Sequence, residues 1–302
     1  MSSTKPVLEL WRLIHSHRVT AVIYAAAKLG LAELLRDGPL SANELAEATG
    51  ANEQALDRLL VALSTIGICT LAGEDRYSLT EMGSGLDGHA EHSFKAWAIF
   101  EGQVLSSGWN RLLDSIMTGK TAAQLQGVSN SFDLMAQSPE TVSLFNAAMV
   151  DVTRFVTPNI LRAFDFSGIT HLMDVGGGSG ELIGAIAKQY SHIKGTVFDL
   201  PRCAGSAIDH LNRMGVGART DFLPGDFFQS VPFGADAIIM KSIIHDWNDE
   251  RSLVILRNCR RALPANGTLL LVERIMPEFP TVNDEHREQA MSDLNMLRGP
   301  GG

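Results

Sequence analysis

The second half of the chain alternates short apolar runs with helix-like segments, and this alternation constrains the fold more than any other feature. The apolar runs are THLMDV, IKGTVFDL, ARTDFL, ADAIIMKS and GTLLLVE, and helices are predicted at ELIGAIAKQY, near Ala204 to Met214, and from about Asp249 to Leu263. Strands that alternate with helices predict a parallel, doubly wound α/β sheet. Any ligand of such a sheet is expected outside the carboxyl ends of its strands.

The first half is predicted to be helical and to carry a β-hairpin. The segment from Val19 to Leu35 is rich in Ala and Leu at helical spacing and is expected to form one helix. Ser41 and Glu44 form a capping box at the start of a second helix, and a third is expected from about Glu53 to Ile66. The alternating segment ICTLAGEDRYSLT then predicts a hairpin. Three helices and a hairpin in this order are typical of a winged helix.

Charge argues against DNA binding by this module. Between Thr20 and Gly85, four cations (Lys28, Arg36, Arg58, Arg76) stand against nine anions (Glu33, Asp37, Glu44, Glu47, Glu53, Asp57, Glu74, Asp75, Glu81). Phosphate would repel a reading helix in so acidic a module. A winged helix of this composition is therefore expected to serve in packing or dimerisation.

The composition of the whole chain excludes several other classes. A length of 302 residues favours two domains, and 25 Lys+Arg against 34 Asp+Glu give a net charge of -9, which disfavours a nucleic-acid partner. Cys69, Cys203 and Cys259 show no C-x-x-C spacing, so neither a disulfide framework nor a zinc site is expected. No signal peptide and no apolar run of about 18 residues occurs. We therefore expect a cytoplasmic protein that does not enter a membrane.

A glycine-rich segment, DVGGGSG, follows the first predicted strand. Gly176, Gly178 and Gly180 allow the backbone to approach a ligand closely. A dinucleotide fingerprint requires glycine at position 181, where this chain has Glu181. A carboxylate at the start of the helix also disfavours a pyrophosphate there. The segment therefore favours a ligand that has a ribose but lacks phosphate.

Acidic residues stand at the ends of the next two predicted strands. Asp199 follows Gly176 by 199 − 176 = 23 residues, where an acidic side chain commonly binds ribose hydroxyls. Asp226 and Phe227 end the third strand and suit an adenine amino group and ring face. Cap or turn chemistry explains each residue alone equally well. Their occurrence in order at successive strand ends instead indicates a nucleoside site.

The segments DVGGGSG, FDLP, GDFF, KSIIHDW and LLLVE, in this order, resemble S-adenosylmethionine-dependent O-methyltransferases that act on small phenols. That family includes plant phenylpropanoid, hydroxyindole and bacterial antibiotic-tailoring enzymes. The resemblance implies a C-terminal Rossmann-like methyltransferase domain, an N-terminal winged-helix-type dimerisation domain, a homodimer, and S-adenosylhomocysteine as product without a metal. It places these residues at the cofactor: Gly176, Asp199, Leu200, Asp226, Phe227, Lys241 and Trp247.

The resemblance divides the chain into three parts. Residues 1–105 are expected to form the winged-helix-like dimerisation domain, residues 106–165 a helical linker that contributes to the substrate pocket, and residues 166–302 the S-adenosylmethionine-binding domain. Family members continue with a second flanking carboxylate, a helix and two strands after the segment that here reads SDLNMLRGPGG. We therefore expect a domain truncated at its C-terminus, with GTLLLVE as an apolar sheet edge.

His245 matches the catalytic base of the family, and Glu273 matches a carboxylate that orients it. A phenol has a pKa of about 10 and a free histidine about 6.5, so complete proton transfer would be uphill by roughly 5 kcal/mol. The proton must therefore leave as the methyl group arrives. A structural histidine at a strand end is the alternative for His245 alone. Asp246 is expected either to cap the next helix or to make a second polar contact.

The acceptor pocket is the least determined part of the prediction. The resemblance places Phe145, Met149, Asp246, Met291, Asn295 and Met296 in it. Thioethers and aromatic rings suit a flat apolar ring, so we expect a small aromatic substrate that bears a hydroxyl. Core packing explains the apolar members equally well.

Three alternatives remain open at this point. The chain could be a cofactor-binding family member that is inactive through truncation or performs decarboxylation, hydroxylation or ring closure. It could also be a winged-helix regulator that senses a ligand, or a nicotinamide dehydrogenase, which Glu181 disfavours. The scattered histidines lack metal-ligand spacing, so metal-dependent catechol methylation is disfavoured.

Overall fold

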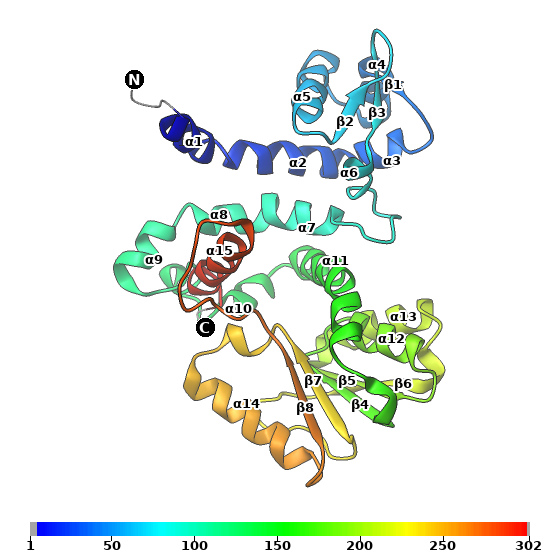
Figure 1. The fold of residues 1–302 in the computed structure, drawn as a ribbon, viewed down its shortest axis with the longest axis vertical. Helices are drawn as coiled ribbons and strands as arrows, with labels where there is room; N and C mark the ends of the chain where they lie inside the picture. Colours follow the sequence, from blue (N-terminus) through cyan, green and yellow to red (C-terminus); the bar gives the residue numbers. More distant parts are fainter. Residues whose placement is uncertain (1–4, 301–302) are drawn as a thin grey trace. The chain divides into compact units, whose positions relative to one another are not determined.

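The computed structural model describes residues 5–300. Two compact units divide the chain: an N-terminal unit, which runs to Ser107 and includes Glu140–Val152, and a C-terminal unit, which comprises Gly108–Pro139 and the described residues from Thr153 onward (Figure 1). The chain passes between the units once in α8 (Ser106–Trp109) and twice in one long helix, α11 (Pro139–Ala163). The predicted boundaries at 105/106 and 165/166 remain predictions.

The N-terminal unit has the predicted order of helices followed by a hairpin (Figure 1). Its small antiparallel sheet has the strand order β1-β3-β2. The elements are α1 (Lys5–Ile14), α2 (His17–Leu29), α3 (Leu31–Leu35), β1 (Leu40–Ser41), α4 (Ala42–Thr49), α5 (Glu53–Thr65), β2 (Cys69–Leu71), β3 (Arg76–Leu79), α6 (Glu81–Ser84), α7 (Lys95–Phe100), a π-helical turn (Glu101–Leu105) and the start of α8 (Ser106–Trp109).

The single helix predicted from Val19 to Leu35 is wrong. Helix α2 ends at Leu29, because Gly30 adopts a left-handed conformation with φ 69° and its N–H donates to the carbonyls of Ala26 and Ala27. Glycine is the usual residue at such a helix end, since it has no Cβ to clash. The capping box is confirmed: the Ser41 hydroxyl accepts from the Glu44 N–H, and the Glu44 carboxylate accepts from the Ser41 N–H.

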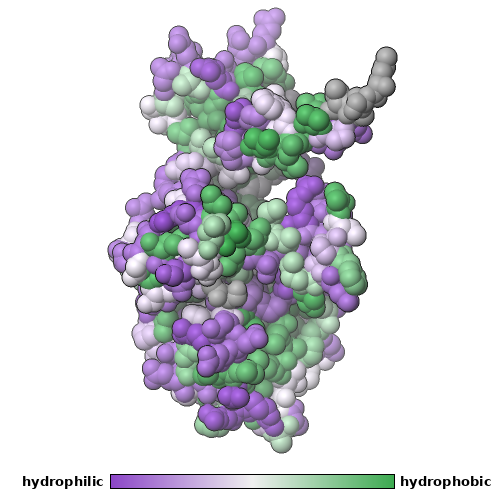
Figure 2. Space-filling model, turned by 90° about the vertical axis from the view of Figure 1, so that its left-hand side faces the viewer, coloured by the Kyte–Doolittle hydropathy of each residue, from purple (hydrophilic) through white to green (hydrophobic). Residues whose placement is uncertain are grey.

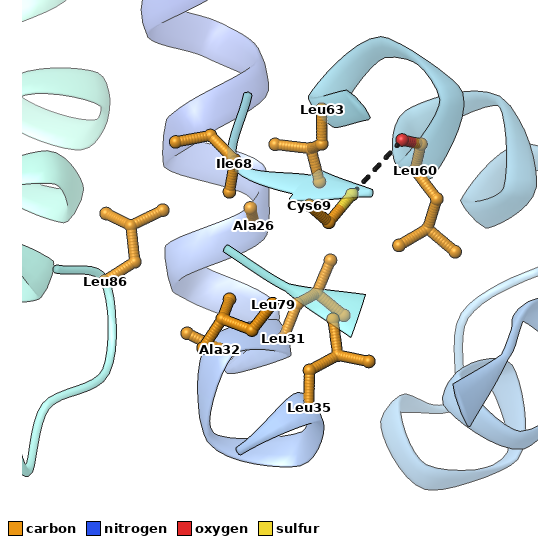
Figure 3. Close-up of a pocket in the computed structure, with 10 residues that line it drawn as sticks. All are labelled: Ala26, Leu31, Ala32, Leu35, Leu60, Leu63, Ile68, Cys69, Leu79 and Leu86. Carbon is orange, nitrogen blue, oxygen red and sulfur yellow. Dashed lines mark hydrogen bonds between the residues drawn. The ribbon is translucent and has the colours of Figure 1, made fainter. Parts of the chain in front are cut away.

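The main buried cluster of the N-terminal unit is made of hydrophobic side chains. Leu45 and Leu60 are fully buried at 0% exposure. Figure 3 shows a hollow in this core between α2, α3, α5 and the hairpin, into which leucine, isoleucine and alanine side chains point. Among the side chains that line it, the Cys69 thiol alone can form a hydrogen bond, and its Sγ lies 3.5 Å from the Leu60 carbonyl oxygen. With no converging polar groups, the hollow is a packing gap and offers no chemistry.

The C-terminal unit contains the predicted parallel sheet, in the order β6-β5-β4-β7-β8 (Figure 1). The order reverses at the central strand β4, which places the binding crevice at its carboxyl end. The strands are β4 (His171–Val175), β5 (Lys194–Asp199), β6 (Thr220–Pro224), β7 (Ala237–Lys241) and β8 (Thr268–Val272). The helices are α9 (Leu112–Thr118), α10 (Ser131–Met135), α12 (Glu181–Gln189), α13 (Ala204–Arg213), α14 (Asp249–Ala262) and α15 (Asp284–Arg298).

Helices cover both faces of this sheet. On one face, Leu172 of β4 packs in a buried cluster with Ile183 of α12 and Leu211 of α13. On the other face, Met173 of β4 packs with Ile255 of α14. Successive strand residues point to opposite faces, so two neighbouring residues of β4 serve two separate cores. This arrangement is the doubly wound α/β class that the strand and helix pattern predicted.

Strand β8 lies at one edge of the sheet within residues 5–300, and Leu271 on it is 46% exposed. Figure 2 shows hydrophobic residues gathered in patches among hydrophilic ones on the face that it presents. Across the described part of the chain, no helix combines the length and the apolar composition that a membrane crossing requires.

Candidate active site

The loop after β4, residues 176–180, is rich in glycine, and there is open space beside its central residue. Gly176, Gly178 and Gly180 have φ values of 74°, 54° and 76°. A Cβ on Gly176 would lie 2.4 Å from the end of the Ile243 side chain, so a larger residue there would have to displace Ile243. A Cβ on Gly178 would meet nothing within 4 Å. The loop therefore approaches protein atoms closely at its start and faces open space at its centre.

Asp199, at the end of β5, is tied to this loop. Its Oδ2 accepts the Gly178 N–H at 2.8 Å, and its Oδ1 accepts the Leu200 N–H at 2.6 Å. Each carboxylate oxygen retains further acceptor capacity, which suits a pair of ribose hydroxyls. The structure thus places Asp199 and Leu200, two residues that the resemblance assigned to the cofactor, beside the loop that contains a third, Gly176.

Aromatic rings gather at the end of β6. Phe227 would lie 3.7 Å from a Cβ on Gly176, so it flanks the glycine loop. Its ring centroid is 6.3 Å from that of Trp247 in an edge-to-face arrangement. Asp226 accepts the Phe228 N–H at 2.8 Å, which fixes the turn that presents these rings. The cluster offers an aromatic face and a carboxylate side by side.

Sequence reasoning missed two members of this cluster. Phe132 of α10 stacks on Trp247 with ring centroids 6.0 Å apart, and the Arg251 guanidinium lies 4.1 Å from the centre of the Phe228 ring. The same guanidinium lies 4.5 Å from the centre of the Trp247 ring, and the short separation of Trp247 and Arg251 in the sequence could have suggested this contact. Nothing in the sequence links Phe132 to a residue 115 positions later, by 247 − 132.

His245 and Glu273 meet just beyond β7 and β8. The Nδ1 atom of His245 lies 2.7 Å from Oε2 of Glu273. The other oxygen of Glu273 accepts the N–H groups of Ile243 and Ile244, at 3.0 and 2.8 Å. Because Nδ1 faces the carboxylate of Glu273, Nε2 is the ring nitrogen that can accept a proton from a ligand. The predicted pair is therefore present with a defined orientation.

The environment of this pair shifts both pKa values. Burial favours the neutral ring of His245, but the contact with Glu273 and the charge of Asp246 outweigh it and raise the pKa of His245. Burial also opposes ionisation of Glu273, yet the close contact with His245 lowers the pKa of Glu273 overall. The two groups thus stabilise each other's charged forms. A base oriented in this way is well suited to accept a proton from a hydroxyl.

Ser242, three residues before His245, has a strained backbone. Its φ of 56° is the sole positive value at a non-glycine position among residues 5–300. Its N–H donates to the Val272 carbonyl at 3.0 Å, which joins the ends of β7 and β8. Such strain concentrates at functional sites, where the surrounding structure holds it. The strained turn carries His245 out of the sheet and toward Glu273.

Further charged groups surround His245. Oδ1 of Asp246 lies 3.6 Å from Nε2 of His245, and burial raises the pKa of Asp246 to about 7. Asp246 does not cap helix α14, because Asn248 does so by accepting the Arg251 N–H at 3.1 Å. Of the two roles considered for Asp246, the cap is therefore wrong. Burial lowers the pKa of Lys241, although Asp174, Glu273 and Asp246 oppose that shift.

Family models match nearly the whole chain. Residues 109–302 match the O-methyltransferase domain and residues 11–86 the O-methyltransferase dimerisation domain. The chain belongs to the O-methyltransferase family. It is 37% identical to phenazine O-methyltransferase PhzM of Lysobacter antibioticus over 269 residues. This match covers 89% of this chain and 79% of that protein. Mitomycin biosynthesis 6-O-methyltransferase of Streptomyces lavendulae is 33% identical, over 86% of this chain and 75% of its own length.

Solved structures agree with this assignment. The structure of LaPhzM matches with a TM-score of 0.92 at 35% identity, over 98% of this chain and 88% of that one. Human N-acetylserotonin methyltransferase in complex with SAM matches with a TM-score of 0.89 at 26% identity, over 99% and 87% of the two chains. The protein is an S-adenosylmethionine-dependent O-methyltransferase with the family's dimerisation domain. The regulator and dehydrogenase alternatives are therefore set aside.

The predicted acceptor residues of this methyltransferase fall in both units. Phe145 and Met149 lie on the part of α11 in the N-terminal unit, where the Phe145 ring is 5.6 Å from that of Phe100. Met291, Asn295 and Met296 lie on α15 in the C-terminal unit, and the Asn295 side-chain oxygen accepts from Arg298. A shared acceptor pocket remains a prediction. Within the described residues, no group of three or more His, Cys, Asp or Glu could hold a metal ion.

Proposed function

We propose that this methyltransferase transfers a methyl group from S-adenosylmethionine to a hydroxyl of a small aromatic acceptor, with His245 as general base and Glu273 as its orienting carboxylate. The observation that carries the proposal is the 2.7 Å contact between His245 and Glu273 beside the glycine loop. Both residues lie at the carboxyl edge of the sheet, where open α/β folds bind their ligands.

The residues present fit the cofactor. Open space at Gly178 and the carboxylate of Asp199 suit a ribose, while Asp226 and Phe227 offer an acceptor and a ring face to adenine. Leu200, Lys241 and Trp247 would complete the cofactor pocket. When bound, S-adenosylmethionine supplies a methyl group on a positively charged sulfur. The carboxyl groups of Asp174, Glu273 and Asp246 lie near Lys241 and outnumber it, which favours a cationic ligand over an anionic one.

His245 must be neutral to act. Its Nε2 then accepts the hydroxyl proton, and the carboxylate of Glu273 stabilises the imidazolium that forms. General bases of this kind contribute about 10²- to 10⁴-fold to a rate. Proton acceptance in step with methyl arrival avoids a free phenolate, which would cost roughly 5 kcal/mol. The pair thus accounts for methylation of a hydroxyl without a metal.

Relatives support a flat aromatic acceptor. One at 32% identity is 2,7-dihydroxy-5-methyl-1-naphthoate 7-O-methyltransferase, and a solved structure at 29% identity contains 2-hydroxy-5-methyl naphthoic acid. Another relative, at 31% identity, is an N,N-dimethyltransferase of an aminoriboflavin, so aromatic amines belong in any screen. We further propose a homodimer, because the dimerisation domain is present. A cytoplasmic location stays a prediction.

Calorimetric titration with S-adenosylmethionine and S-adenosylhomocysteine tests the site first. We expect the wild type to bind both and Asp199→Ala to lose most of the affinity. Methyl transfer to a panel of phenols, naphthols and aromatic amines then tests the chemistry, with His245→Ala compared against His192→Ala, an exposed histidine of the same unit. Wild-type turnover in His245→Ala would refute its role as base, and absence of cofactor binding by the wild type would refute the cofactor site.

A further inference from the structure

Three helices of the C-terminal unit meet at a buried carboxylate that the proposed reaction does not use. Glu181, the first residue of α12, is 6% exposed. Its Oε2 lies 3.0 Å from Nη2 of Arg154 on α11 and 2.7 Å from Nε2 of His210 on α13. Its Oε1 accepts from Nε of Arg154 at 3.3 Å. A carboxylate only accepts, so His210 donates from Nε2.

The contacts of Glu181 change the charge that a ligand would meet at the start of α12. The sequence predicted that its carboxylate would repel a phosphate at the start of α12. In the structure Arg154 lies against that carboxylate with two hydrogen bonds, so the local charge is balanced. Burial alone would raise the pKa of Glu181, but His210 and Arg154 lower it overall and keep it ionised. An ionised carboxylate in the first turn is also favoured by the helix dipole.

Glu181 directly follows the glycine loop, residues 176–180, and its contacts can restrict the conformation of the last loop residue. Three left-handed glycines make this segment permissive, so its shape depends on outside contacts. The Gly176 N–H donates to the Phe198 carbonyl at 2.8 Å, which fixes the entry, and Asp199 holds the centre. At the exit, Glu181 holds the loop to α11 and α13.

Helix α13 also supports the loop exit by packing. Leu211, next to His210, would lie 3.2 Å from a Cβ on Gly180. One turn of α13 therefore both packs against the last glycine of the loop and donates a hydrogen bond to the residue that follows it. Loss of that hydrogen bond would loosen the loop exit without removing any group that meets the ligand directly.

We propose that Glu181 is a positioning residue for cofactor binding, which acts through the glycine loop and depends on Arg154 and His210 to hold it. The proposal rests on the proposed cofactor site. A role confined to stability would lower the melting temperature and leave the dissociation constant of the folded protein unchanged. A positioning role changes that constant, because the loop must be reordered each time the ligand binds.

Titration with S-adenosylhomocysteine on Glu181→Gln and on His210→Leu tests this. Each variant is expected to raise the dissociation constant about tenfold, the effect of leaving a buried polar group unsatisfied. His210→Gln restores an N–H donor and is expected to recover most of the affinity. The matched control is Asp87→Asn, a buried, ion-paired carboxylate of the N-terminal unit, which should lower the melting temperature and leave the constant unchanged.

The outcomes separate the two proposals. A wild type that fails to bind S-adenosylhomocysteine overturns both. A wild type that binds, together with Glu181→Gln and His210→Leu variants of unchanged affinity, overturns the positioning role alone. If Glu181→Gln does not fold, the pair His210→Leu and His210→Gln decides: equal affinities overturn the positioning role, and recovery in the glutamine variant supports it.

Discussion

A buried carboxylate of the N-terminal unit and two buried carboxyl groups at the proposed site of the C-terminal unit differ in their charge. In the N-terminal unit, Asp87 is buried against Arg36, and this ion pair lowers the pKa of Asp87 to about 2. In the C-terminal unit, burial raises the pKa values of Asp174 and Asp246 to about 7, because neither has a full partner. Desolvated, unpaired carboxyl groups destabilise a fold. Their position beside Lys241 and His245 indicates that chemistry, rather than stability, keeps them there.

Polar groups in the N-terminal unit mainly fix secondary structure. Ser41, Asn52 and Thr80 accept backbone N–H groups at helix starts. In the C-terminal unit, Glu273 and Asp199 also accept backbone N–H groups, but they direct their remaining acceptor capacity toward His245 and the glycine loop. The same kind of hydrogen bond therefore begins helices of the N-terminal unit and orients functional groups of the C-terminal unit.

The largest expected effect is a loss of activity on substitution of one residue of the C-terminal unit. His245→Ala removes the base, and we expect kcat to fall by about 10² to 10⁴. The substitution should leave the affinity for S-adenosylhomocysteine within a few-fold of the wild type. Single-turnover methyl transfer measures the first quantity and calorimetry the second. A variant that lost both equally would show that His245 supports the site rather than the reaction.

Glu273→Gln should change both the rate and its dependence on pH. Glu273 raises the pKa of His245, and the base must be neutral, so wild-type activity falls as pH drops through that raised pKa. Loss of the carboxylate lowers the pKa of His245 and moves this acid limb to lower pH. The plateau rate should fall as well, by about tenfold, because the imidazolium loses its partner. A pH–rate profile with an unmoved acid limb would contradict the pairing.

Most of the fold followed from patterns that lie close together in the sequence. Strand ends, the capping box at Ser41 and the placement of His245 each depend on residues within a few positions, and the structure places them as expected. The bond from Glu181 to Arg154 and His210 spans 27 and 29 residues, and it depends on how three helices pack. The sequence gives the sign of each charge, whereas the packing decides its partner. The break at Gly30 was missed because the apolar spacing continues through it.

Stability should respond in opposite directions when the two kinds of buried carboxyl are replaced. Asp87→Asn removes a paired charge and should cost about 1 to 2 kcal/mol at pH 7. The lowered pKa of Asp87 means that its contribution is present above about pH 4 and is lost as pH falls toward 2. Thermal unfolding of the variant and the wild type across this range measures the difference.

Asp246→Asn should stabilise the protein instead. With a pKa of about 7 when folded and an ordinary value of 3.8, Asp246 binds a proton on folding between these pH values. Folding stability from this group therefore falls as pH rises from about 4 to 7. The variant should gain about 1 kcal/mol at pH 8 and much less at pH 4, a rough figure for a desolvated carboxylate. A loss of stability at pH 8 would show that the carboxylate has a partner in solution.

The smallest expected effect comes from two glycines that differ only in their surroundings. Gly50 and Gly178 have φ values of 71° and 54°, and a Cβ on either would meet no protein atom within 4 Å. Alanine at each site should therefore cost a similar backbone strain of about 1 kcal/mol. Gly50 ends helix α4, whereas Gly178 faces the space assigned to the cofactor. Gly178→Ala should also weaken binding of S-adenosylhomocysteine several-fold, and Gly50→Ala should leave it unchanged. Equal affinities would mean that the space beside Gly178 is not where the ligand lies, because the added methyl group would then point into solvent in both variants.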